Sequence, residues 1–111
     1  MSDKLLIIIS SSDVAKAKTG LIYATNALKH GWVEEIKLVV FGPAEQVLVN
    51  DATLQEALHQ FMEQNQEVAA CKAISDMAEA SDALASLGIN VMYVGKYVSD
   101  LIKQGYTPMV W

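Results

Sequence analysis

Continuous apolar runs alternate along the chain with stretches in which apolar residues recur every three to four positions. Continuous runs are typical of strands that are covered on both faces, and the longer period is typical of helices with one buried side. The apolar runs end at polar, glycine or proline residues, which favour turns. The pattern predicts five strands, at residues 4–10, 36–41, 67–70, 89–93 and 106–111.

The stretches between these runs predict helices. The first has its apolar stripe from Val14 to Leu28, and Gly31 is a candidate C-cap. Segment 44–49 fits a short helix or an extended piece. Further helices are expected at 54–62, at 72–80 with one more turn at 83–87, and from Gly95 to before Gly105. In the last of these, we expect the inward residues to be Tyr97, Val98, Leu101 and Ile102.

Alternation of strands and helices predicts an α/β fold, a three-layer sandwich with a mostly parallel sheet and right-handed crossovers. Residues 1–111 are expected to form a single domain, since no linker or repeat interrupts the pattern. For five strands the flavodoxin-like order 2-1-3-4-5 is common, and we predict it here, with the edge-like strand 106–111 last. In that order, the loop Ser10–Asp13 and the end of the third strand at Cys71 would face one crevice.

The composition adds an expectation about assembly. Hydrophobic residues make up 52 % of the 111 residues and charged residues 19 %, against roughly 45–50 % and 25 % in ordinary soluble chains. A small domain has too much surface to bury such an excess alone, so we expect a homo-oligomer. The candidate interface residues are Met109, Val110, Trp111 and the segment 47–49.

The charge argues against nucleic acid as a partner. The net charge is −5, with only eight Lys and Arg residues and no basic cluster, whereas phosphate binding needs a basic face. The apolar run 5–9 is too short for a signal peptide or a membrane span. The single cysteine is an unpaired thiol, which suits a reducing compartment, so a cytoplasmic location is expected.

That cysteine, Cys71, is the main candidate for chemistry, because it lies where an apolar strand passes into a helix. Two interpretations remain open. Cys71 is a small packing residue, as free cysteines commonly are, or a reactive thiolate favoured by helix amides and by Lys72. Neighbouring Ala69 and Ala70 oppose the second interpretation, since desolvation raises the pKa of a thiol.

Several other functions lack the residues they require. A single cysteine excludes dithiol redox chemistry within one chain. A Cys-His hydrolase is also not expected, because neither His30 nor His59 is placed to act as a catalytic base for Cys71 in the same subunit. One Cys and two distant His have no metal-ligand spacing, and no dinucleotide or P-loop motif occurs, so the sequence predicts no metal and no cofactor. Ser10, Ser11, Ser12 and Lys72 are candidate anion-binding residues of the crevice, although Ser and Asp before a helix more commonly act as caps.

Nearly the whole chain resembles the DsrE/DsrF-like family of small α/β proteins, which includes the TusD subunit of the tRNA-thiolation sulfur relay. The resemblance rests on the order and spacing of an opening apolar strand with a polar loop, the strand end 39–43, a strand that reaches Cys71, and the closing pattern 94–106. It implies trimers or hexamers and a sulfur-accepting cysteine, whose place falls on Cys71.

The resemblance therefore implies a sulfur carrier or sulfurtransferase that accepts sulfur as a persulfide on Cys71 and works with sulfur donor and acceptor proteins. One thiol suffices for this chemistry, because a thiolate can attack a donor persulfide directly. The alternative is a non-catalytic oligomeric module that binds small molecules or proteins, in which Cys71 is structural.

Overall fold

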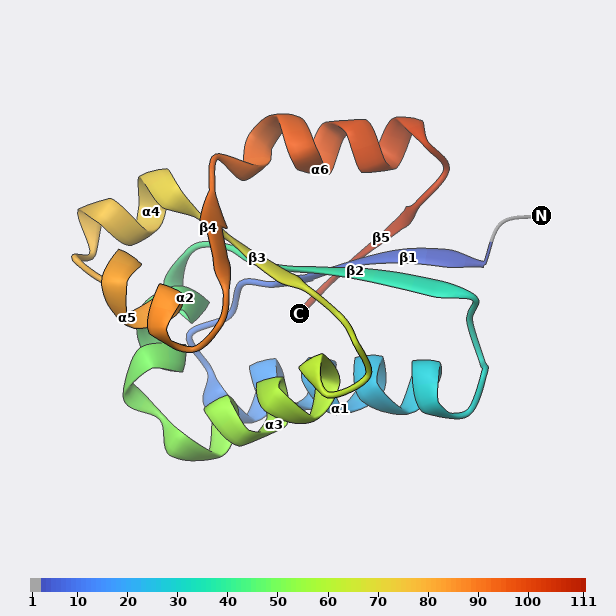
Figure 1. The fold of residues 1–111 in the computed structure, drawn as a ribbon, viewed down its shortest axis with the longest axis horizontal. Helices are drawn as coiled ribbons and strands as arrows, with labels where there is room; N and C mark the ends of the chain where they lie inside the picture. Colours follow the sequence, from blue (N-terminus) through green and yellow to red (C-terminus); the bar gives the residue numbers. More distant parts are fainter. Residues whose placement is uncertain (1–2) are drawn as a thin grey trace.

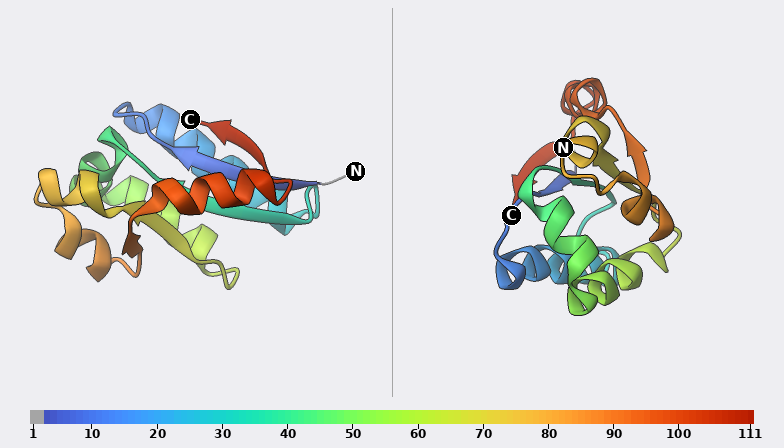
Figure 2. Two further views of the ribbon diagram at one scale, coloured as in Figure 1. Left: turned by 90° about the horizontal axis from the view of Figure 1, so that it is seen from above. Right: turned by 90° about the vertical axis from the view of Figure 1, so that its left-hand side faces the viewer.

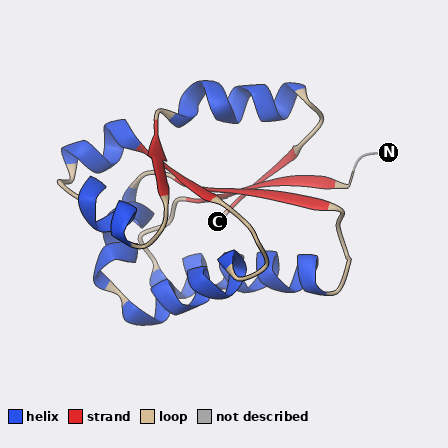
Figure 3. Ribbon diagram, viewed as in Figure 1, coloured by secondary structure: helices blue, strands red, loops and turns tan. Residues whose placement is uncertain are grey.

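The computed structural model describes residues 3–111, which fold around one sheet of five strands (Figure 3). The strands are β1 (Lys4–Ile9), β2 (Glu35–Val40), β3 (Val68–Cys71), β4 (Asn90–Met92) and β5 (Thr107–Val110). The helices are α1 (Val14–Lys29), α2 (Pro43–Asn50), α3 (Ala52–Met62), α4 (Lys72–Met77), α5 (Ser81–Ser86) and α6 (Val94–Lys103). All predicted strands are present, and the ambiguous segment 44–49 is helical.

Helices cover both faces of the sheet. The views in Figures 1 and 2 place α1 and α3 side by side on one face and α6 on the other. The side-chain amide of Gln64, just after α3, donates to the carbonyl of Thr25 in α1 at 3.1 Å. Every strand pairing is parallel. The predicted α/β class, with a parallel sheet between helical layers, is confirmed.

The strand order is β4-β3-β2-β1-β5, so the predicted order 2-1-3-4-5 is wrong. From β1 to β4 the chain steps in one direction, which places α1 and α3 on the same face because crossovers are right-handed. The last crossover then returns over the opposite face through α6, and β5 pairs with the free side of β1. The last strand does lie at an edge, as predicted.

The sheet separates two apolar clusters. The larger lies under α1 and α3, and Phe61 of α3 is its largest fully buried side chain. The smaller lies under α6 and contains Cys71 together with Leu6, Val39, Ala69, Val94, Leu101 and Tyr106. Leu101 is buried as expected and Tyr97 and Val98 pack against this cluster. Ile102 was expected to face inward but is 47 % exposed.

Most of the candidate interface residues are used within the chain. Leu48 is buried in the larger cluster, and Met109 and Trp111 pack against it. Trp111 lies over Gly20 of α1, where an added Cβ would be only 2.5 Å from the indole Cγ. Val110 alone among these residues is largely exposed, at 62 %. Part of the apolar excess is therefore absorbed by the core.

Within residues 3–111, no helix combines the length and the apolar character needed to cross a membrane.

Candidate functional site

Cys71 is the last residue of β3 and the N-cap of α4, with the extended backbone angles φ −74° and ψ 115°. It lies beside Met92, the last residue of β4. After β3 the chain enters α4, and after β4 it enters α6 (Figure 1). Ile74 of α4 packs against the same apolar cluster as Val94 and Leu101 of α6. Ligands of open α/β sheets bind at the carboxyl ends of the strands, where Cys71 lies. The Cys71 side chain is only 7 % exposed, because it packs in the cluster under α6.

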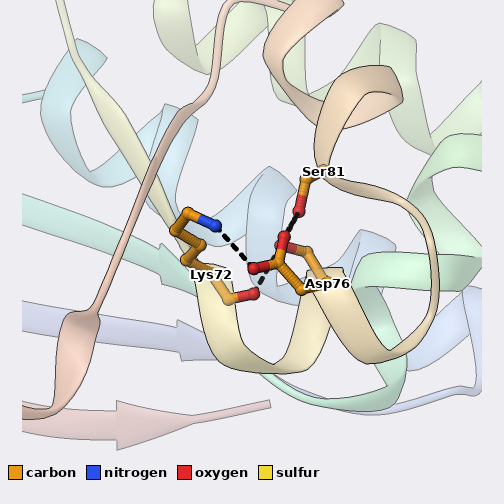
Figure 4. Close-up of polar contacts among 4 residues, drawn as sticks. Lys72, Asp76 and Ser81 are labelled. Carbon is orange, nitrogen blue, oxygen red and sulfur yellow. Dashed lines mark hydrogen bonds and ion pairs between the residues drawn. The ribbon is translucent and has the colours of Figure 1, made fainter.

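Lys72, the predicted anion-binding residue beside the thiol, is already paired. Its Nζ lies 2.5 Å from Oδ2 of Asp76, one helical turn later (Figure 4), and 5.8 Å from the centre of the Tyr93 ring. The hydrogen bond to Asp76 raises the pKa of Lys72, and the same bond lowers the pKa of Asp76, assisted by Ser81. The ammonium is therefore partly neutralised where a thiolate or an anion would need it.

Two serines extend this polar contact toward the interior. Ser81 donates to Oδ1 of Asp76 at 2.5 Å (Figure 4), and its hydroxyl lies 2.7 Å from the hydroxyl of Ser75. Ser75 is fully buried, and its hydroxyl oxygen also lies 3.2 Å from the carbonyl oxygen of Lys72. These bonds join the start of α5 to α4. Their effect is to fix the helical turn that follows Cys71.

The serine loop after β1 is separated from Cys71. The amides of Ser10 and Ser11 both donate to the carbonyl of Trp111, at 2.7 and 3.1 Å, and Ser11 Oγ accepts from the Asp13 amide. Strand β2 lies between β1 and β3, which places the two strand ends about 10 Å apart. The expectation of a shared crevice was therefore wrong, because it depended on the strand order.

The third serine of the loop borders a different hollow. Ser12 lines a depression of about 390 Å³ between the start of α1 and α2, together with Val14, Pro43, Gln46, Val47, Asn50 and Asp51. Asp13 caps α1 by accepting from the amides of Ala15 and Lys16. The loop thus serves α1 as a cap, which is the commoner role expected for such residues.

A residue that the sequence did not single out lies beside Cys71. Glu45 is in the first turn of α2 and is completely enclosed, at 0 % exposed. Within residues 3–111, neither of its carboxyl oxygens has a hydrogen-bond partner. Burial raises the pKa of Glu45 to about 7, and the backbone N–H of Cys71 opposes this rise to a smaller extent. That N–H is thus close enough to act on the carboxyl, without hydrogen-bond geometry.

The sequence carries one weak signal for this burial. On a helical wheel Glu45 lies next to Leu48, which separates it from Ala44, and both of these residues are buried. An acidic residue in the first turn of a helix is ordinarily explained by the helix dipole and is expected at the surface. Here α2, α4 and α5 gather over the carboxyl end of the sheet (Figure 2), and α2 packs against the other two.

The chemistry available at this edge is that of a thiol and a carboxyl group. Neither histidine reaches it, because His30 ends α1 and stacks on Trp32, and His59 lies within α3. In the described part of the chain, no three His, Cys, Asp or Glu side chains gather as a metal site would require. A carboxyl group can hold or release a proton near neutral pH when burial raises its pKa.

The sequence matches no family model and no curated protein. Two solved structures share its fold. The conserved protein of unknown function BT1422 from Bacteroides thetaiotaomicron superposes with a TM-score of 0.91 at 22 % identity, covering 98 % of this chain and 95 % of that one. MTH1491 from Methanobacterium thermoautotrophicum, also of unknown function, superposes with a TM-score of 0.72 at 14 % identity, covering 97 % and 98 %. Both similarities establish the fold of the chain.

Proposed function

We propose that the protein is a sulfur carrier that accepts a sulfur atom as a persulfide on Cys71 and passes it to an acceptor thiol. The observation that carries this proposal is the place of the chain's single thiol. Cys71 ends a strand at the edge where α/β sheets bind ligands, with an enclosed carboxyl group beside it. The resemblance to the DsrE/DsrF-like family supports the same assignment.

The transfer balances with one thiol. The Cys71 thiolate attacks the outer sulfur of a donor persulfide, R–S–S–H, so that a new S–S bond forms, the donor S–S bond breaks, and R–S⁻ leaves. An acceptor thiolate then attacks the outer sulfur of Cys71–S–S–H and releases the Cys71 thiolate. Because Cys71 is 7 % exposed, each attack requires local opening of the packing between β3 and α6.

The same burial favours a second candidate function, a non-catalytic binding module in which Cys71 only packs. Incubation with glutathione persulfide, followed by intact mass measurement, separates the two. The carrier gains one sulfur atom that a reductant removes, and a Cys71→Ser variant of unchanged circular dichroism gains none. No gain, together with resistance of Cys71 to alkylation in the folded protein, contradicts the carrier and favours the binding module.

We further propose that the protein works as a homo-oligomer, a trimer or hexamer, in the cytoplasm. The unpaired thiol supports a reducing compartment. Exposed Val110 and Trp32, at 62 % and 59 %, support an interface. Sedimentation at micromolar concentration is expected to give a species larger than a monomer, and a monomer would contradict the proposed assembly.

A further inference from the structure

The outer sides of α1 and α3 meet in a groove on the face that points away from the sheet (Figure 1). Two hollows, of about 380 and 530 Å³, share Glu56 and Gln60 and therefore form one continuous α1–α3 groove. The wall from α1 is a stripe with steps of three or four residues, Lys18, Ile22, Thr25 and Lys29. The other wall comes from α3 and the turn after it, with Ala52, Thr53, Glu56, Ala57, Gln60, Glu63 and Gln64.

The groove is apolar near the start of the two helices. Ile22 is 47 % exposed there, and it lines the smaller hollow together with Ala52 and Ala57. A single exposed isoleucine is ordinary on a protein surface. The charges around Ile22 give the groove a more specific character.

The two walls carry opposite charges. Lys18 and Lys29 lie on the α1 wall, and Glu56 and Glu63 lie on the α3 wall. Within residues 3–111, none of these four side chains forms an ion pair, although Lys18 acts through space on the N-cap residue Asp51. The four formal charges cancel, in a chain of net charge −5. Two copies can therefore approach at this groove without the repulsion that the rest of the surface causes.

The direction of the helices decides how a second copy fits. Both α1 and α3 connect parallel strands and therefore run in the same direction. A two-fold axis parallel to the helices places α1 of one copy on α3 of the other, so Lys18 meets Glu56. A two-fold axis across the helices places α1 on α1, so Lys18 meets Lys29. The charges favour the first arrangement and oppose the second.

We propose that the α1–α3 groove is a self-complementary interface that binds the same groove of a second copy about a two-fold axis parallel to the helices. Lys18 of each copy pairs with Glu56 of the other, and the two Ile22 side chains are covered between them. The inference rests on the proposed homo-oligomer and is independent of the role of Cys71. Because a two-fold contact joins subunits in pairs, it fits the hexamer and not the trimer of the proposed assemblies.

The test reverses one charge on either wall and measures mass by sedimentation equilibrium at micromolar concentration. Lys18→Glu and Glu56→Lys each place like charges face to face across the axis. In each variant, association through the groove should weaken about tenfold or more, so that species with half the wild-type number of subunits appear. An equimolar mixture of the two variants should restore the wild-type mass, since each copy then finds an opposite charge on the other.

Lys16→Glu is the matched control. Lys16 is exposed on α1 and does not line the groove, so this variant changes the net charge equally and should keep the wild-type mass. Equal weakening in the control, or a mixture that does not reassemble, overturns the proposal. A wild-type trimer overturns the groove interface and leaves the homo-oligomer, whereas a wild-type monomer overturns both.

A second pair of variants tests the groove without a change in charge and covers a charge variant that does not fold. Ile22 in the groove and Ile102 on α6 are each 47 % exposed. Ile22→Ser should weaken association through the groove about tenfold, because the covered isoleucine loses apolar contact. Ile102→Ser should associate like the wild type. Equal association of the two variants overturns the proposal.

Discussion

Burial of Glu45 makes the stability of the protein depend on pH in a direction opposite to that of most carboxylates. The pKa of Glu45 is raised by burial from 4.5 to about 7 in the folded protein. Between these values the folded protein holds a proton that the unfolded chain has released. The stability from this group is therefore fully present below pH 4.5 and is lost as the pH rises through about 7.

The size of the effect follows from the shift. At 1.36 kcal/mol for each pKa unit, the wild type should lose about 3 kcal/mol from this group alone between pH 4.5 and pH 8. Glu45→Gln carries no charge at either pH. The free energy of unfolding of the wild type, relative to that of the Gln variant, should therefore fall by about 3 kcal/mol over this range.

Urea denaturation followed by circular dichroism, at half-unit steps from pH 4.5 to 8.5, measures this difference. Glu63→Gln serves as the matched control, since it removes an exposed carboxylate and should run parallel to the wild type. Parallel curves for the wild type and Glu45→Gln would refute the reasoning, because they would mean that Glu45 ionises in the folded protein as it does in the unfolded chain.

Three further predictions concern the packing. Gly20→Ala places a Cβ 2.5 Å from Cγ of Trp111, so the free energy of unfolding in urea should fall by about 1–3 kcal/mol; an unchanged value would mean that the indole moves aside freely. Asp51→Ala removes the acceptor of the Leu54 amide at 2.8 Å, so the thermal midpoint should fall while Asp51→Asn retains most of it; equal midpoints for both variants contradict the role of the cap. Burial, assisted by Glu35, raises the pKa of Tyr106 to about 12. The step at the highest pH in an ultraviolet titration of the tyrosines should therefore be absent from Tyr106→Phe. A step that persists in this variant would contradict the assignment to Tyr106.

The elements of the fold were predictable because they depend on local patterns. The apolar run 5–9 and the polar, glycine or proline residues that end the segments placed every strand within about two residues. The order of the strands depends instead on contacts between apolar faces of segments that lie as much as a hundred residues apart in the sequence. Nothing in the spacing of α6 indicates that it returns over β3 and β1, so the common order was chosen and was wrong.

The candidate site was predictable to a smaller extent. Cys71 was identified because it is the single cysteine of the sequence and because its position at the end of a predicted strand is one where α/β sheets bind ligands. Glu45 was missed because the first turn of a helix ordinarily explains an acidic residue. Its burial arises from the packing of α2 against α4 and α5, a tertiary contact that the local sequence does not encode. Ser10 was placed in the wrong crevice for the same reason.

The late position of α6 in the chain has a consequence for the synthesis of the protein. On a translating ribosome, β1 to β4 emerge before α6 and β5, and the pairing of β5 with β1 joins residues roughly a hundred positions apart. Until that pairing forms, α6 is not held over the face with Cys71. The nascent chain therefore presents a more open thiol to oxidants and electrophiles, and the closing of α6 ends that exposure.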